Sequence, residues 1–74
     1  MTGSLVTHGF GRALPLWHSC PGQVEAHDLS AACNFEPETA AVVLTLRHTT
    51  HGRFVRILTA GGLGWISADL VNVL

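Results

Sequence analysis

The chain has 74 residues, of which 47% are hydrophobic and 12% are charged, and its net charge is −1 with four Arg, no Lys and five acids. This length allows one domain with a single core, and the composition is too apolar for a disordered segment. Arg12, Arg47, Arg53 and Arg56 are too few and too dispersed for a nucleic-acid-binding surface, and the longest apolar run, residues 40–44, is too short to span a membrane. We therefore expect a small soluble domain that binds neither nucleic acid nor membranes.

The N-terminus carries no readable secretion signal, because Thr7, His8 and Gly9 interrupt the apolar core that such a signal needs. We therefore expect a cytoplasmic protein. The absence of Lys beside abundant Ala, Leu, Gly and Arg indicates a bacterial source with a high GC content.

The first part of the chain contains one predicted strand. Residues 1–11 combine Gly, Ser and Thr with isolated apolar residues, which is typical of a flexible arm. Residues 13–17 alternate well enough to predict a short strand, which Pro15 confines to an edge or margin of the sheet because its nitrogen cannot donate to a ladder. Leu14 and Leu16 share one face of this strand, and we do not expect both to be exposed.

The middle of the chain predicts an irregular loop and two more strands. The loop begins at residues 20–22, and residues 29–35 are apolar enough for a second strand. An acidic turn around Pro37 follows. Residues 41–48 contain three β-branched residues and precede a hairpin-like turn, which favours a strand. The alternative is a helix over residues 36–46 with Pro37 in its first turn.

The last third predicts a hairpin, a strand, one helical turn and a final strand. Two β-rich runs flank a Gly-Gly pair at residues 61–62, and the second run leads into Ser-Ala-Asp at residues 67–69 before a last apolar pair. Alternation along the first run places Val55 and Ile57 on one side. We expect these two residues in the core and Trp65 as the large aromatic that closes it. Three further residues complete the expected core: Leu44, Leu46 and Ile66.

Residues 64–71, Gly-Trp-Ile-Ser-Ala-Asp-Leu-Val, resemble the Gly-aromatic-aliphatic-Pro/Ser-x-Asn/Asp-aromatic/Leu-Val ending of Src-homology-3 and bacterial SH3-like domains. Residues 13–17 are similar to the Ala-Leu-Tyr-Asp-Tyr stretch that starts such domains, and residues 28–30 resemble the Glu-Leu-Ser that follows their first long loop. The resemblance implies an all-β fold: a small five-stranded SH3-like barrel over residues 12–74, with one short 3-10 turn before the last strand, preceded by the flexible arm of residues 1–11.

The family binds proline-rich peptides across aromatic ridges, because a polyproline II helix loses little entropy on docking. The chain has no Tyr, and Phe54 and Ser67 stand where the family usually has Trp and Pro, which favours a more general protein or cell-wall-peptide groove. Glu25 and Asp28 lie in the loop where such domains keep carboxylates for a basic ligand residue. The resemblance thus implies a non-catalytic module that binds a protein or peptide through a shallow, partly apolar groove. The expected ligand-binding residues are Pro15, Trp17, Glu25, Asp28, Phe54, Ser67 and Leu70.

Two other functions remain open. One is structural: an apolar edge could pair with a second copy or another domain, giving a homo-oligomer or a larger assembly. The other is a metal- or redox-responsive protein, since Cys20, Cys33, His18 and His27 have zinc-binding atoms, although their spacing matches no familiar zinc site. The two cysteines could also form a disulfide in an oxidising compartment. Without a signal peptide, free thiols are favoured.

Catalysis is not expected. His48 and His51 lack a third ligand or an adjacent carboxylate, and residues 61–64 lack the Lys-Ser/Thr of a phosphate loop. A nucleophile such as Cys20 or Cys33 would also need a deep cleft, which a domain of this size does not provide. The sequence therefore predicts no enzymatic activity, no metal and no cofactor.

Overall fold

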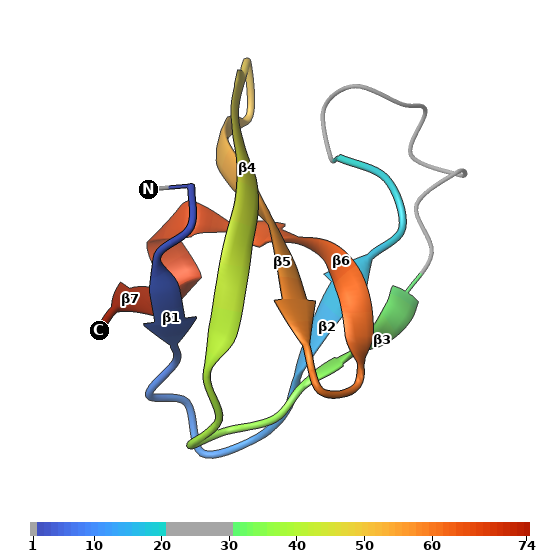
Figure 1. Ribbon diagram of the computed structural model, residues 1–74. Helices are drawn as coiled ribbons and strands as arrows, with labels where there is room; N and C mark the ends of the chain where they lie inside the picture. Colours follow the sequence, from blue (N-terminus) through green and yellow to red (C-terminus); the bar gives the residue numbers. More distant parts are fainter. Residues whose placement is uncertain (1, 21–30) are drawn as a thin grey trace.

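The computed structural model describes residues 2–20 and 31–74, and in this part of the chain seven strands form one antiparallel sheet that curls into a half-barrel (Figure 1). The strands follow the order β3-β2-β6-β5-β4-β1-β7 across the sheet. A 3-10 turn, η2 (Ala68–Leu70), precedes the last strand. The strands are β1 (Leu5–Thr7), β2 (Leu14–Trp17), β3 (Ala31–Phe35), β4 (Ala41–Thr49), β5 (Gly52–Thr59), β6 (Gly62–Ser67) and β7 (Asn72–Val73).

The predicted all-β class and the 3-10 turn before the last strand are confirmed, whereas the predicted number of strands is wrong. The resemblance implies five strands, and the described residues contain seven; β1, which pairs with β4 and β7, is not predicted at all. The helical alternative for residues 36–46 is also wrong, since β4 begins at Ala41. None of the described residues belongs to a helix that is long and apolar enough to cross a membrane.

Strand β1 lies inside the segment for which the sequence predicts a flexible arm. Val6 is fully buried and lies opposite Ala41 of β4. The backbone N–H of Gly3 donates to the carbonyl of Val43 at 2.7 Å, and the N–H of Val43 donates to the carbonyl of Ser4 at 2.9 Å. The expectation fails because the second edge of β4 needs hydrogen-bond partners, and a short, weakly patterned segment is sufficient to supply them.

Two side chains tie the end of β1 to the predicted turn around Pro37, which joins β3 to β4. The Nε2–H of the buried His8 donates to the carbonyl of Phe35 at 2.8 Å, and the rings of these two residues meet edge to face with their centroids 4.7 Å apart. The hydroxyl of Thr7 donates to the carbonyl of Thr39 at 2.9 Å. These segments meet at the bottom of Figure 1. They link regions that are far apart in the sheet order, so they help to close the half-barrel.

Both predicted hairpins are confirmed, and each is held by a threonine at its start. In the β4–β5 turn the Oγ1 of Thr49 accepts from the backbone N–H of His51 at 3.1 Å and donates to the carbonyl of Gly52 at 3.0 Å. In the β5–β6 turn the Oγ1 of Thr59 accepts from the backbone N–H groups of Gly61 and Gly62, both at 3.1 Å, and donates to the carbonyl of Gly62 at 2.9 Å. The φ angles of the two glycines are 119° and 139°, which L side chains rarely adopt.

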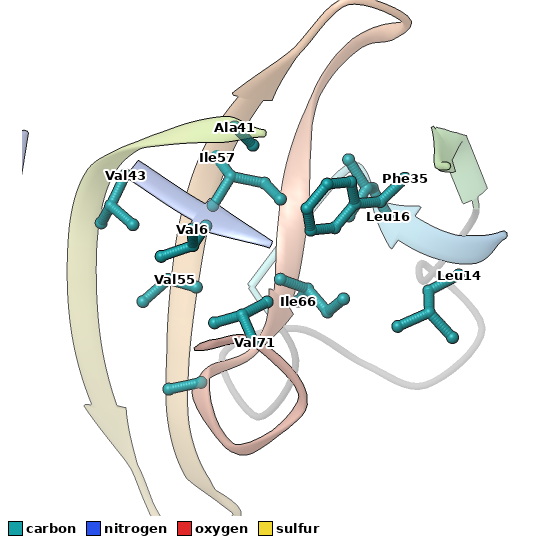
Figure 2. Packing of buried hydrophobic residues seen from close by; sticks show 11 residues of the cluster. Val6, Leu14, Leu16, Phe35, Ala41, Val43, Val55, Ile57, Ile66 and Val71 are labelled. Carbon is teal, nitrogen blue, oxygen red and sulfur yellow. The ribbon is translucent and has the colours of Figure 1, made fainter. Parts of the chain in front are cut away.

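The core fills the inside of the curled sheet (Figure 2). Val55 and Ile57 are fully buried and Ile66 is nearly so, as predicted. Leu14 and Leu16 are both buried on one face of β2. The cluster consists of Val6, Leu14, Leu16, Phe35, Ala41, Val43, Val55, Ile57, Ile66, Ala68 and Val71.

A β-bulge in β4 explains why one predicted core residue is exposed. Val43 lies opposite Ile57, but the next pair is Thr45 with Arg56, so Leu44 is the extra residue of the bulge. Leu44 is 39% exposed, and its prediction as a core residue is wrong. Before the bulge the odd-numbered residues of β4 face the core, and after it the even-numbered residues do. Leu46 therefore faces inward and packs against the core cluster, as predicted.

Candidate binding face

The sheet has a second side, which points away from the core cluster and which we call the outer face. Successive residues of a strand alternate between the two faces. Ile66 of β6 belongs to the core cluster, so Trp65 and Ser67 on either side of it belong to the outer face. Cross-strand partners share a face, and the register of the neighbouring strands therefore extends this assignment to β2, β4 and β5.

Two tryptophans occupy neighbouring positions on the outer face. Trp17 of β2 is the cross-strand partner of Trp65 of β6. Trp65 is only 8% exposed, as the sequence predicts for a closing aromatic, but it is not a member of the core cluster. Trp17 is half-buried. The two rings thus lie together on the outer face and outside the core cluster, and Trp17 is the more exposed of the two.

Two arginines flank this aromatic surface. The Cζ atom of Arg47 lies 5.8 Å from the ring centroid of Trp65, a distance at which the cation is attracted to the ring. Arg56 is the cross-strand partner of Trp65, and both arginines are exposed. The alternation that places Val55 and Ile57 on one side of their strand predicts that Arg56, which lies between them, faces the other way, and the structure agrees. Arg47 stands out in the sequence only as a dispersed charge.

Phe54 and Ser67 form the next pair along β5 and β6, and both are half-buried. The Oγ of Ser67 accepts from the backbone N–H of Asp69 at 3.3 Å and so caps η2. Leu70 lies at the end of this turn and is 38% exposed.

Arg53 and Asp69 lie 3.5 Å apart and are well exposed, so their ion pair contributes little to stability.

Pro15 is exposed on β2, opposite Asn34 of β3. It precedes Trp17 by two residues and therefore shares the outer face. The pairing of β2 with β6 is at Trp17, which leaves Pro15 at the margin of the sheet, as predicted. Glu25 and Asp28 lie outside the described residues. The structure thus brings four predicted site residues to one face: Pro15, Trp17, Phe54 and Ser67.

The outer face also carries an apolar row, which was not expected from the sequence. It consists of Leu5, Val42, Leu58 and Leu63, which are paired in succession across β1, β4, β5 and β6. Leu5 and Leu58 are each 49% exposed, whereas the other two are half-buried. Because this row adjoins Arg56, apolar and cationic side chains alternate along the outer side of β5.

The two cysteines differ in environment. Cys20 is 5% exposed, and burial raises the pKa of its thiol while the positive charge of Arg47 acts in the opposite direction. Cys33 is a free thiol whose Sγ donates to the carbonyl of Leu63 at 4.0 Å, so the Cys20–Cys33 disulfide is not formed. Within residues 2–20 and 31–74 no group of three or more His, Cys, Asp or Glu side chains is arranged to hold a metal ion. His27 lies outside these residues.

Comparison of the chain with protein-family models, curated proteins and solved structures gives no match. The class of the protein therefore rests on its own features. They define an all-β half-barrel with an aromatic, cationic and apolar outer face.

Proposed function

We propose that the chain is a non-catalytic binding module of the SH3-like type, which takes a protein or peptide segment on its outer face. The observation that carries this proposal is the pairing of Trp17 with Trp65 outside the core cluster, with Arg47 over the second ring. Trp and Arg are among the residues that most often dominate the energetics of protein interfaces. Their concentration on one face of a small domain favours recognition over a purely structural role.

The architecture supports this proposal in outline. The chain is an antiparallel half-barrel with a 3-10 turn before its last strand, and residues 64–71 carry the resemblance to SH3-like domains. The seven strands exceed the five that the resemblance implies, so the SH3-like assignment rests on the ending of the chain and not on the strand count. A cytoplasmic location and a bacterial source stay predictions from the sequence.

The proposed mode of binding is apolar anchoring. Trp17 and Phe54 are half-buried, so a ligand can cover the rest of each ring without disturbing the core. Leu70 offers a third apolar contact on the turn that Ser67 caps. An extended, stiff peptide suits such a shallow surface, because it loses little conformational entropy when it docks.

Amide chemical-shift mapping tests this proposal. The isotope-labelled chain is titrated with pools of short peptides, including proline-rich ones. We expect shifts centred on Trp17, Phe54 and Trp65. Shifts confined to β1, β7 and the edge of β3 would instead locate binding elsewhere and contradict the proposal.

A second candidate function is self-association, which the exposed apolar row favours. Leu5 and Leu58 present apolar surface that contact with a second copy could cover. This candidate predicts an apparent mass that rises with protein concentration in sedimentation equilibrium. It also predicts that the Leu58→Arg variant keeps the monomer mass at every concentration. A constant monomer mass would exclude it and leave the binding module as the remaining proposal.

A further inference from the structure

We infer that the partner segment is acidic: it places a carboxylate against Arg56 and Arg47 while its apolar residues cover the adjoining outer face. The inference rests on the proposed function, because it names the ligand class of the same face. Arg56 is exposed beside Trp65, and Arg47 is exposed with its guanidinium over the ring of Trp65. Two cations therefore share one aromatic surface.

The described carboxylates lie in other parts of the fold. Glu36 and Glu38 flank the turn between β3 and β4, and Asp69 lies on η2, where it pairs with Arg53. Within the described residues the outer face of β4, β5 and β6 thus carries two positive charges and no side-chain carboxylate. The whole chain has a net charge of −1. Among the described side chains, Arg47 and Arg56 are therefore the charged groups on this part of the outer face, and their charge favours an anionic partner.

The geometry of the arginines suits a carboxylate. The planar guanidinium of an arginine presents a fork of N–H donors, and the exposed Arg47 and Arg56 can offer this fork to a planar acceptor. Carboxylates match this fork with two parallel hydrogen bonds, which are stronger than bonds between neutral groups.

The apolar row indicates which kind of residue flanks the acidic residue in the ligand. Leu58 lies two residues from Arg56 on the same side of β5, and its partner in β6 is Leu63. A peptide that reaches Arg56 along β5 therefore has the aliphatic surface of Leu58 on one side and the half-buried ring of Phe54 on the other. The structure assigns a ligand in which an acidic residue is flanked by apolar residues, and not a run of acids.

The test uses three pools of short peptides that are random except for one central residue, which is Glu, Gln or Lys. Each pool is titrated against the intact chain by fluorescence anisotropy. We expect the Glu pool to bind about tenfold more tightly than the Gln pool, and the Lys pool to bind weakest. Raising the salt concentration should reduce the advantage of the Glu pool, because exposed charges are screened.

Two matched variants locate the effect. Arg56→Gln removes a charge from the outer face, and we expect it to bring the Glu and Gln pools to within about threefold of each other. Arg12→Gln removes an exposed charge in the segment before β2 and should leave the preference unchanged. Equal loss in both variants would show an effect of net charge alone and would overturn the inference.

The outcomes separate this inference from the proposal on which it rests. Equal binding of the three pools, with amide shifts on the outer face, overturns the acidic preference and leaves the binding module intact. Tightest binding of the Lys pool also overturns it and favours ligand selection by Glu25 and Asp28. Failure of every pool to bind overturns the proposed function itself.

Discussion

Gly64 lies against Leu16 so closely that a Cβ atom at position 64 would be 2.5 Å from the Cβ of Leu16. The same atom would be 3.2 Å from the carbonyl oxygen of Trp17. Strand β6 can therefore approach β2 at this point because residue 64 has no side chain. The next residues along the two strands are the paired Trp17 and Trp65, so this close approach also brings the two tryptophans together on the outer face.

Substitution of Gly64 should separate the two strands. We expect Gly64→Ala to lower the free energy of unfolding by about 1–3 kcal/mol, because the new methyl group meets a Cβ and backbone that cannot move independently. Equilibrium urea denaturation measures this loss. Gly9→Ala is the matched control, since nothing lies within 4 Å of the position that its methyl group would take, and we expect it to change stability by less than about 0.5 kcal/mol. Equal stability of the two variants would contradict the close approach of β6 to β2.

Because of the bulge in β4, we expect truncation of Val43 to destabilise the protein more than truncation of the larger Leu44 does. Val43 is fully buried, whereas Leu44 is 39% exposed. Val43→Ala should cost about 2 kcal/mol through the cavity that it leaves, and Leu44→Ala should cost less than about 1 kcal/mol. Denaturation of the two variants under identical conditions measures the difference. A larger loss in Leu44→Ala would mean that the bulge lies elsewhere.

His8 should be needed to hold β1 in the sheet. Its Nε2–H bond to Phe35 and its ring contact are both lost in His8→Ala, for which we expect a loss of about 2–4 kcal/mol. The amide of Gly3, which donates to Val43, should then exchange faster with solvent. His51→Ala removes an exposed ring and serves as the control. Unchanged exchange at Gly3 would show that β1 does not depend on this contact.

The environment of Cys20 gives a prediction about pH. Burial raises the pKa of the Cys20 thiol, and the charge of Arg47 favours the thiolate and opposes this rise. Arg47→Gln should therefore raise the pKa further and move the alkylation profile of Cys20 with iodoacetamide to higher pH. The experiment uses a Cys33→Ser background, so that one thiol reacts. Arg56→Gln should move the profile less, and a shift to lower pH in Arg47→Gln would contradict the assignment.

The sequence predicts those parts of the fold that depend on residues close together in the chain. The turns at residues 49–52 and 59–62 carry their own Thr and Gly, and alternation along β5 places Val55 and Ile57 inside. The sequence carries no comparable signal for the bulge, because Leu44 is as apolar as Val42, Val43 and Leu46 around it. Strand β1 is missed for a similar reason, since its pairing with β4 joins segments that are far apart in the chain.

The candidate site divides in the same way. The resemblance near the end of the chain predicts Phe54 and Ser67 as site residues, and the structure pairs these two residues across β5 and β6. The contact of Arg47 with Trp65 depends on how β4, β5 and β6 are aligned, which composition and spacing do not reveal. The opposite facing of Trp65 and Ile66 could have been predicted, because alternation alone puts adjacent residues on different sides of a strand.

The most direct test of the outer face as a binding surface is the Kd of Trp17→Ala for the tightest peptide from the pools. Trp17 is half-buried on that face, and Phe10 is an exposed aromatic outside the strands, at 44%. We expect Trp17→Ala to weaken binding by about tenfold or more, as for an interface anchor, and Phe10→Ala to leave the Kd unchanged. An unchanged Kd in a folded Trp17→Ala variant, or the same loss in Phe10→Ala, would contradict the account.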